Sequence, residues 1–175
     1  MSLPELQNED ITLRELSLDD AQGVYPSWLN DPVVTKFNSH GEKEYTKEMA
    51  IEYISSVKNS KTHHVFSIIY HEQHIGNISL QNIDWTNRCA EFAIIIGNAS
   101  VYGKGIGHTA GKLLIDYGFN VLNLHRIYCG TSQDNIGMQH LAIKLGMKKE
   151  GQRIDAFLKN HTYKDVLDYG IVQEK

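Results

Sequence analysis

The chain has 175 residues and a net charge of -4, and the absence of a basic excess argues against a general nucleic-acid binder. Apolar residues make up 41% and charged residues 22%, as in ordinary globular proteins. No apolar run approaches the roughly 20 residues that a membrane span needs, so we expect a cytoplasmic protein without a membrane partner. The length fits a single domain over residues 1–175. Cys89 and Cys129 lack metal-ligand spacing, and we expect free thiols.

The first half of the chain predicts a strand, two helices and a meander of three antiparallel strands. Alternating apolar and polar residues at 11–16 indicate the first strand. A helix that is short or kinked at Pro26 follows and ends near Leu29. A second helix is expected from about Thr46 to Val57. The three strands then fall at 65–70, 75–84 and 89–96, the first two joined by a turn containing His71 and His74.

The second half predicts two helices and three further strands. A helix at about 107–122 presents one apolar face made of Ala110, Leu113, Leu114, Tyr117 and Val121. A strand at 126–131 and a shorter helix that Gly146 closes come next. Two strands at about 147–158 and 163–172 end the chain. This order of elements indicates one mixed α/β domain.

The glycine-rich turn between strand 89–96 and the following helix indicates an anion site. Gly103, Gly105 and Gly107 let the backbone approach a ligand, and the helix directs its free N–H groups toward it. Neither Asp nor Glu occurs from residue 92 to 115, while Lys104 and Lys112 do. A tight turn without a ligand is one alternative. A dinucleotide site is another, which the preceding antiparallel strands disfavour, and the spacing excludes a P-loop.

The segment Tyr-Gly-Lys-Gly-Ile-Gly at 102–107 resembles the pyrophosphate-binding motif of the GCN5-related N-acetyltransferase (GNAT) family, with Tyr102 in place of the usual Gln or Arg. That aromatic residue and the segments 122–127 and 133–135 resemble the ribosomal-protein (Rim-type) branch. The resemblance implies a mixed α/β fold with a central, mostly antiparallel sheet of about seven strands and flanking helices. It also implies a splay between the fourth and fifth strands.

Acetyl-CoA is the co-substrate that the resemblance implies, with no metal. The expected cofactor-binding residues are the end of strand 89–96, the glycine turn, the start of the helix and one asparagine before the next helix: Ile94, Ile95, Ile96, Tyr102, Gly103, Lys104, Gly105, Ile106, Gly107, His108, Thr109 and Asn135. The isoleucines could equally be core residues. Asn135 could equally be a helix cap.

Transfer of an acetyl group to an amine needs a group that takes the amine proton. Glu91 interrupts an apolar strand, where burial would disfavour its charged form and tune it as a base; the alternative is that it faces water or pairs with Arg88. The tyrosine that serves as acid in many relatives falls on Ala142, so Ser132 or Tyr128 could replace it, or the thiolate could leave unassisted.

Nine histidines do not show the spacing of a zinc site. The adjacent His63 and His64, and the pair His71 and His74, are expected to be solvated loop residues.

The acceptor cleft in this family lies between the first two helices and the final hairpin, which indicates the segments 28–34 and 160–166 and singles out Trp28, Asn30 and Tyr163. Trp28 could equally be a helix-packing residue, and Tyr163 could instead pair across the hairpin. We expect direct attack in a ternary complex by a small amine or a nucleotide-linked amino sugar. The alternatives are a protein N-terminus, as for Rim-type enzymes, and a polyamine, for which the acids at 42, 44 and 48 would favour a cation. A non-catalytic acyl-CoA-binding module is the alternative of a different class. A homodimer is a further expectation.

Overall fold

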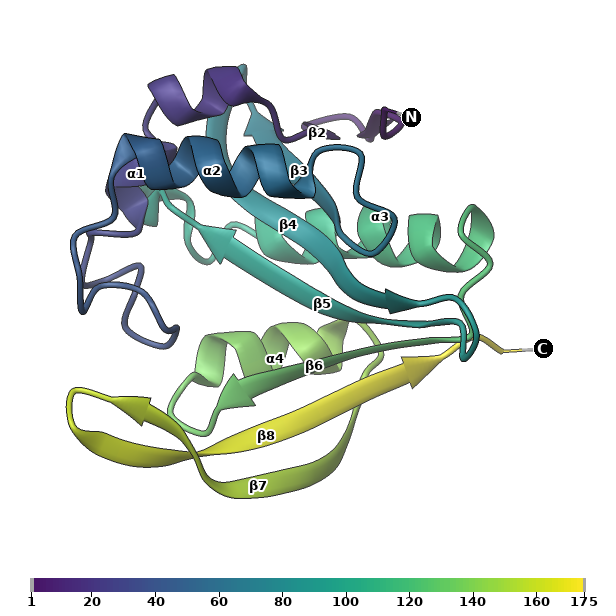
Figure 1. The fold of residues 1–175 in the computed structure, drawn as a ribbon. Helices are drawn as coiled ribbons and strands as arrows, with labels where there is room; N and C mark the ends of the chain where they lie inside the picture. Colours follow the sequence, from purple (N-terminus) through teal and green to yellow (C-terminus); the bar gives the residue numbers. More distant parts are fainter. Residues whose placement is uncertain (1, 175) are drawn as a thin grey trace.

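The computed structural model describes residues 2–174, and its eight strands form one sheet in the order β1-β2-β3-β4-β5-β6-β8-β7 (Figure 1). Neighbouring strands are antiparallel except β5 and β6, which are parallel. The strands are β1 Leu6–Gln7, β2 Ile11–Glu15, β3 His64–Tyr70, β4 Gln73–Asp84, β5 Cys89–Ile96, β6 Arg126–Ser132, β7 Lys148–Lys159 and β8 Thr162–Val172. The helices are η1 Leu18–Gln22, α1 Tyr25–Trp28, α2 Lys47–Val57, η2 Ala99–Val101, α3 Ile106–Asn120 and α4 Ile136–Lys144.

The predicted mixed α/β fold is confirmed, and three details differ from the prediction. The sheet has eight strands rather than seven, because the two-residue strand β1 is too short to show a sequence pattern. The first predicted helix is two short pieces, η1 and α1, since Pro26 occupies the first turn of α1 and begins a new helix. Val121 lies just past the end of α3 and is 64% exposed, so it does not belong to the apolar face of that helix.

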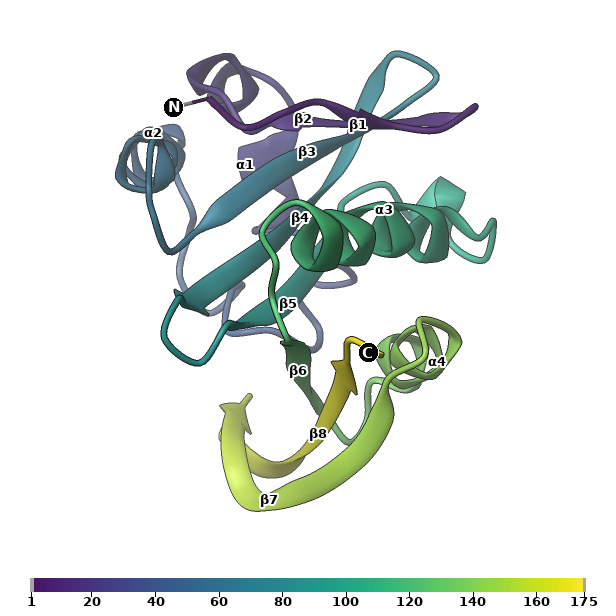
Figure 2. The ribbon, with the colours of Figure 1, turned by 90° about the vertical axis from the view of Figure 1, so that its right-hand side faces the viewer.

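Helices cover both faces of the sheet and bury two clusters of apolar side chains (Figure 2). The larger cluster lies under α3 and α4, and the smaller lies under α1 and α2. Successive residues of a strand point to opposite faces. Ile94 and Ile96 therefore pack against the larger cluster, whereas Ile95 packs against the smaller one with Trp28. No helix of the described chain has both the length and the apolar character to cross a membrane.

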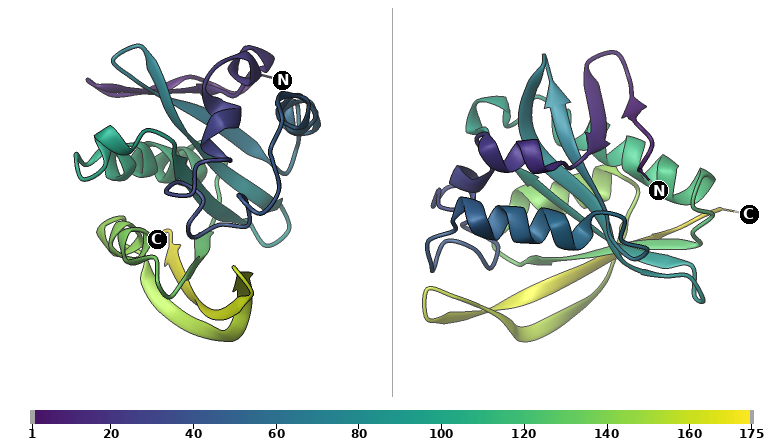
Figure 3. Two further views of the ribbon diagram at one scale, coloured as in Figure 1. Left: turned by 90° about the vertical axis from the view of Figure 1, so that its left-hand side faces the viewer. Right: turned by 45° about the horizontal axis from the view of Figure 1, so that its top comes forward.

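The splay that positions the site lies between β5 and β6. The two strands pair at three positions, of which the last joins Glu91 to Tyr128. Beyond that point β5 continues to Ile96 and β6 continues to Ser132, but the two strands no longer pair with each other and they diverge (Figure 1). The curved β7–β8 hairpin extends the sheet beyond β6 and forms a concave wall (Figure 3).

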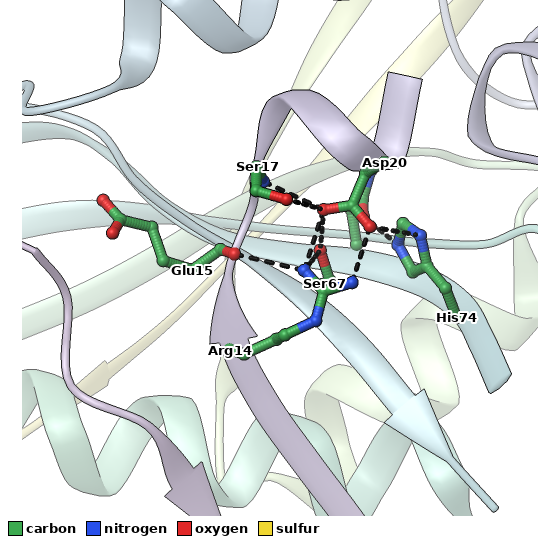
Figure 4. A network of polar contacts seen from close by, with 7 residues as sticks. Arg14, Glu15, Ser17, Asp20, Ser67 and His74 are labelled. Atoms are coloured by element: carbon green, nitrogen blue, oxygen red, sulfur yellow. Dashed lines mark hydrogen bonds and ion pairs between the residues drawn. The ribbon is translucent and has the colours of Figure 1, made fainter. Parts of the chain in front are cut away.

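A buried ionic network fixes η1 to the sheet (Figure 4). The carboxylate of Asp20 accepts hydrogen bonds from both Arg14 Nη atoms at 2.8 and 2.6 Å, from the backbone N–H of Ser17 at 2.9 Å and from Ser67 Oγ at 3.0 Å. His74 Nδ1 lies 3.2 Å from the same carboxylate. Burial alone would raise the pKa of Asp20, but the bonds from Arg14 and His74 outweigh it and hold that pKa well below its usual range.

Candidate active site

A cavity of about 700 Å³ occupies the splay, a size typical of small-molecule sites. Its walls come from the end of β5, the glycine turn, the first residues of α3, the start of α4 and the loop between α1 and α2. The predicted residues that line it are Glu91, Ile94, Ile95, Ile96, Tyr102, Gly103, Gly105, Ile106, Gly107, His108 and Asn135. Residues from both faces of the sheet contribute, so the cavity passes through the sheet where β5 and β6 part.

The glycine turn forms an open cradle at the start of α3. Gly103 and Gly105 have φ angles of +76° and +79°, which side chains rarely tolerate, and a Cβ on either would meet no atom within 4 Å. The N–H groups of the first helical turn have no partner within the helix, and that turn has no acidic residue. Uncovered N–H groups beside open space suit an anionic ligand.

Two predicted members of this cradle differ from the rest. Thr109 does not line the cavity, and its backbone N–H is already bonded to Gly105 O at 3.0 Å, so it cannot also serve an anion. The exposed Lys104 does not line the cavity either. Its charge can act there only over distance, through solvent.

Tyr102 connects the glycine turn to β5. Its hydroxyl donates a hydrogen bond to the carbonyl oxygen of Ile96 at 2.8 Å. Partial burial, helped by the charge of Asp31, raises the pKa of this phenol, so the hydroxyl keeps the proton that it donates. Tyr102 therefore fixes the turn against the strand end.

The open edge of β5 faces the cavity. Backbone groups of an antiparallel strand alternate between its two neighbours, and Gly97 N–H bonds to Ile75 O on β4. Ile94 and Ile96 therefore direct their N–H and C=O groups toward the gap, whereas Ile95 directs its own toward β4. The C=O of Ile96 already accepts the hydrogen bond from Tyr102, so the N–H and C=O of Ile94 and the N–H of Ile96 are the groups with which a linear ligand in the gap can pair, as an added strand would.

Glu91 lies at the point where β5 and β6 part. It is half-buried, and its carboxylate accepts a hydrogen bond from Asn82 Nδ2 at 2.9 Å. The alternative that it pairs with Arg88 is wrong, because no ion pair of the described chain includes Glu91. Together with Gly130 it lines both the splay cavity and a second cavity of about 490 Å³ on the concave wall.

The second cavity has a charged lining over β5, β6, β7 and β8. Arg126 is paired with Glu150, and Arg153 with Asp168 at 2.9 Å, which leaves Glu91 as the one charged residue of the described lining outside an ion pair. Three carboxylates against two guanidinium groups give the lining an excess of one negative charge. Arg153 is close enough to Glu91 to interact with its charge, but its hydrogen bonds and its ion pair go to Asp168.

Tyr128 also lines this second cavity, directly opposite Glu91 in the sheet. Partial burial and the nearby Glu91 raise the pKa of its phenol. It does not line the splay cavity.

Three residues near or within α4 were considered for a role at the site, and the structure shows the surroundings of each. Asn135 is the N-cap, since its side chain accepts a hydrogen bond from Met138 N at 3.1 Å, and it also lines the cavity. Ser132, the last residue of β6, is 4% exposed, accepts a hydrogen bond from Asp134 N and does not line the cavity, so it fixes the start of the turn before α4. Ala142 is buried in the core and offers no acid group.

The structure brings none of the three predicted acceptor residues to the cavity. Trp28 is 6% exposed and packs so closely on Gly97 that any Cβ there would overlap its ring. Asn30 exchanges hydrogen bonds with the backbone of Tyr45, at 2.9 and 2.8 Å, and so holds the base of the α1–α2 loop. Tyr163 is 61% exposed on β8. Tertiary contacts, which a single sequence does not report, occupy Trp28 and Asn30, whereas Tyr163 stays exposed to solvent.

Sequence reasoning missed residues that do line the site. Phe37 and Asn38 of the α1–α2 loop line the cavity, just beyond the segment 28–34 that the resemblance indicated, and Val33 and Val34 line it from within that segment. Lys159 Nζ fixes this loop by donating to Asn38 O at 2.9 Å and to His40 O. Lys159 and the loop are far apart along the chain, so the sequence alone gives no sign that they are in contact.

Two histidines expected in solvated loops lie inside the protein instead. His64 is 9% exposed and its Nδ1 is 2.9 Å from the hydroxyl of Tyr117, and burial lowers the pKa of His64. His74 joins the Asp20 network from the first residues of β4. Among residues 2–174, no group of three or more His, Cys, Asp or Glu side chains is arranged to hold a metal ion.

Comparisons with known proteins agree with this geometry. The spermidine N(1)-acetyltransferase of Vibrio cholerae is 38% identical over 101 residues, and that of Escherichia coli strain K12 is 37% identical over 100 residues. The matched part of the chain, 58% and 57% of its length, spans 58% and 53% of these two relatives. A crystal structure of spermidine N-acetyltransferase from Vibrio cholerae in complex with CoA and spermine is 27% identical, with a TM-score of 0.86 over 95% of this chain and 97% of that one.

Residues 10–148, most of the chain, match the family model described as the acetyltransferase (GNAT) domain. The open-edged β5, the glycine cradle and the splay are thus features of a chain that belongs to the GNAT acetyltransferase family.

Proposed function

We propose that the chain is an N-acetyltransferase that transfers the acetyl group of acetyl-CoA to a primary amine of a polyamine. The observation that carries the proposal is one cavity that passes through the sheet, with an anion cradle on the α3 side and Glu91 at its other end. Donor and acceptor can therefore occupy the splay together. We also propose that residues 1–175 form a single N-acetyltransferase domain.

The donor side suits the chemistry of coenzyme A. The N–H groups of Ile106, Gly107 and His108 would hold the pyrophosphate, and the free edge of β5 at Ile94 and Ile96 would pair with the amide-containing arm. Acetyl-CoA supplies an activated thioester, so the chain itself needs no acyl-carrying nucleophile. Neither Cys89 nor Cys129 lines either cavity, which favours direct transfer in a ternary complex.

We expected a small amine or a nucleotide-linked amino sugar as acceptor, and the charge of the second cavity favours a polyamine over the amino sugar. The second cavity has an excess of one negative charge, and its two guanidinium groups are held in ion pairs rather than free for a diphosphate. The two relatives from Vibrio cholerae and Escherichia coli are named spermidine N(1)-acetyltransferases. These relatives do not place the chain in the Rim-type branch. Acetylation of a protein N-terminus is therefore the second alternative.

Glu91 is the residue that we assign as base. A protonated amine would be drawn to its carboxylate, which then accepts the proton, directly or through water, and leaves a neutral nucleophile. We assign no acid group, because Ala142 occupies the position of the family tyrosine and Ser132 is buried and does not line the cavity. The leaving thiolate needs little help, since an ordinary thiol has a pKa of about 8.5.

The test is release of free CoA from acetyl-CoA with a panel of acceptors, namely spermidine, spermine, an N-terminal alanine peptide and a nucleotide-linked amino sugar. We expect the highest kcat/KM with the polyamines. A preference for the amino sugar or the peptide would overturn the acceptor class. Binding of acetyl-CoA by calorimetry without turnover of any acceptor would favour the non-catalytic module, and failure to bind acetyl-CoA would overturn the whole proposal.

A further inference from the structure

The β4 strand carries a bulge directly beside Glu91. Its pairing with β5 runs one to one from Gly76 to Gln81, which pairs with Glu91, and then resumes with Asp84 opposite Cys89. Two residues, Asn82 and Ile83, thus oppose Ala90 alone. Bulges of this kind redirect side chains and are frequent beside active sites.

The bulge changes the face on which Asn82 lies. In an undisturbed strand, residue 82 would pair with Ala90 and point into the core, on the face opposite to Glu91. Instead Ile83 takes the core position, with 3% exposure, and Asn82 is exposed on the same side as Glu91. Asn82 has a φ of +52°, a left-handed conformation that asparagine tolerates better than most residues.

In this conformation the amide of Asn82 reaches the carboxylate of Glu91, with Nδ2 to Oε2 at 2.9 Å. No other hydrogen bond to the Glu91 side chain is present in the described chain, so Oε1 keeps its accepting capacity for a substrate proton. A neutral amide donor stabilises the ionised carboxylate and fixes its direction. Because it carries no charge, it does not compete with a cationic amine as an arginine or lysine would.

We infer that Asn82 is a positioning residue for Glu91, and that the bulge in β4 exists to present it; this inference rests on the proposed function of Glu91 as the base. Asn82 keeps the carboxylate aimed at the splay, so that it can take the proton of the acceptor amine.

The informative variant is Asn82→Gly, because glycine keeps the left-handed backbone without strain while the amide is lost. Loss of one hydrogen bond to a charged group predicts a fall in kcat/KM of about tenfold, with the acidic limb of the pH–rate profile moved to higher pH. Asn82→Asp replaces the donor by a like charge and should move that limb further, by about one unit or more.

The matched control is Asn123→Gly, which makes the same change at another exposed left-handed asparagine (φ +53°) in the turn before β6, away from both cavities. It should leave kcat/KM and the pH–rate profile unchanged. A folded Asn82→Gly enzyme with the wild-type pH–rate profile and kcat/KM would overturn the inference.

A second measurement does not depend on turnover. The titration of the Glu91 side chain, followed by carbon NMR of labelled glutamate, should have a midpoint about half a unit or more higher in Asn82→Gly than in the wild type. Equal midpoints would overturn the inference even if the enzyme acetylates polyamines. If the wild type acetylates no amine, the proposed function fails, and this titration alone decides the role of Asn82.

Discussion

The hydroxyl of Tyr102 donates a hydrogen bond to the carbonyl oxygen of Ile96 at 2.8 Å, and so joins the glycine turn to the end of β5. The family motif has Gln or Arg at the position of Tyr102, and here an aromatic residue stands between the anion cradle and the strand edge. Tyr102→Phe should raise the KM for acetyl-CoA about threefold to tenfold with little change in kcat, since one neutral hydrogen bond contributes about 1 kcal/mol.

Steady-state kinetics at saturating acceptor measure this effect. Tyr163→Phe is the matched control, because that tyrosine is 61% exposed on β8 and lines neither cavity. Equal KM values for wild type and Tyr102→Phe would show that the bond does not hold the turn.

Gly105→Ala should weaken acetyl-CoA binding by at least about tenfold. A Cβ at φ +79° costs about 1 kcal/mol or more, and it also projects into the open space of the cradle. Gly146→Ala provides the control, since Gly146 has a φ of +85° at the end of α4, outside the cavity. Calorimetry should show both variants destabilised and only Gly105→Ala impaired in binding. Equal affinities in the two variants would contradict the cradle.

Glu91→Gln should lower kcat/KM by about 100-fold or more, the usual contribution of a general base. The variant should also lose the acidic limb of the pH–rate profile, because no carboxylate remains to ionise. Its dissociation constant for acetyl-CoA, measured by calorimetry, should not change. A wild-type rate and profile in the folded variant would exclude Glu91 as the base.

Asp20 should make the free energy of unfolding depend on pH. Its pKa is lower in the folded than in the unfolded protein, so its stabilisation is complete above the unfolded pKa of about 3.9 and is lost as pH falls below that value. Asp20→Asn should cost about 3 kcal/mol at pH 7, because it leaves Arg14 without its buried partner. Urea unfolding should show this difference shrinking as the pH falls below about 4. A difference that is constant with pH would contradict the role of the charge.

Lys159 should control the mobility of the loop that lines the acceptor side of the splay. Its ammonium donates to Asn38 O and His40 O, so Lys159→Met should raise hydrogen exchange in residues 33–42 and the KM for the amine, while the KM for acetyl-CoA stays the same. Lys149→Met, at an exposed position of β7, is the control. Unchanged exchange in the loop would show that other contacts hold it.

The elements nearest to the donor site could be predicted well because their signals are local. Strand β5 was predicted with its observed bounds, since an apolar run between polar turns has few other solutions. The start of α3 was predicted to within one residue from the alternating glycines. Two of these glycines have left-handed backbones, which their lack of a Cβ allows.

The acceptor side could not be predicted, because its residues come from segments far apart in the chain. Trp28 was considered either a substrate-binding or a packing residue, and it packs against Gly97. Asn30 was expected to bind substrate, yet its side chain is bonded to the backbone of Tyr45. His64 and His74 were expected in solvent, and contacts with Tyr117 and Asp20 bury them. The bulge that turns Asn82 toward Glu91 has no signature in a single sequence, because register depends on the partner strand.

By itself the sequence determined the secondary structure around the glycine turn and predicted that this turn suits an anion, since backbone conformation and helix polarity follow from neighbouring residues. Only the tertiary structure decided which carboxylate stays outside an ion pair, which face Asn82 lies on and which loop closes the splay. These features depend on long-range pairing of strands, and the distance between side chains across a sheet is set by the fold rather than by their separation along the chain.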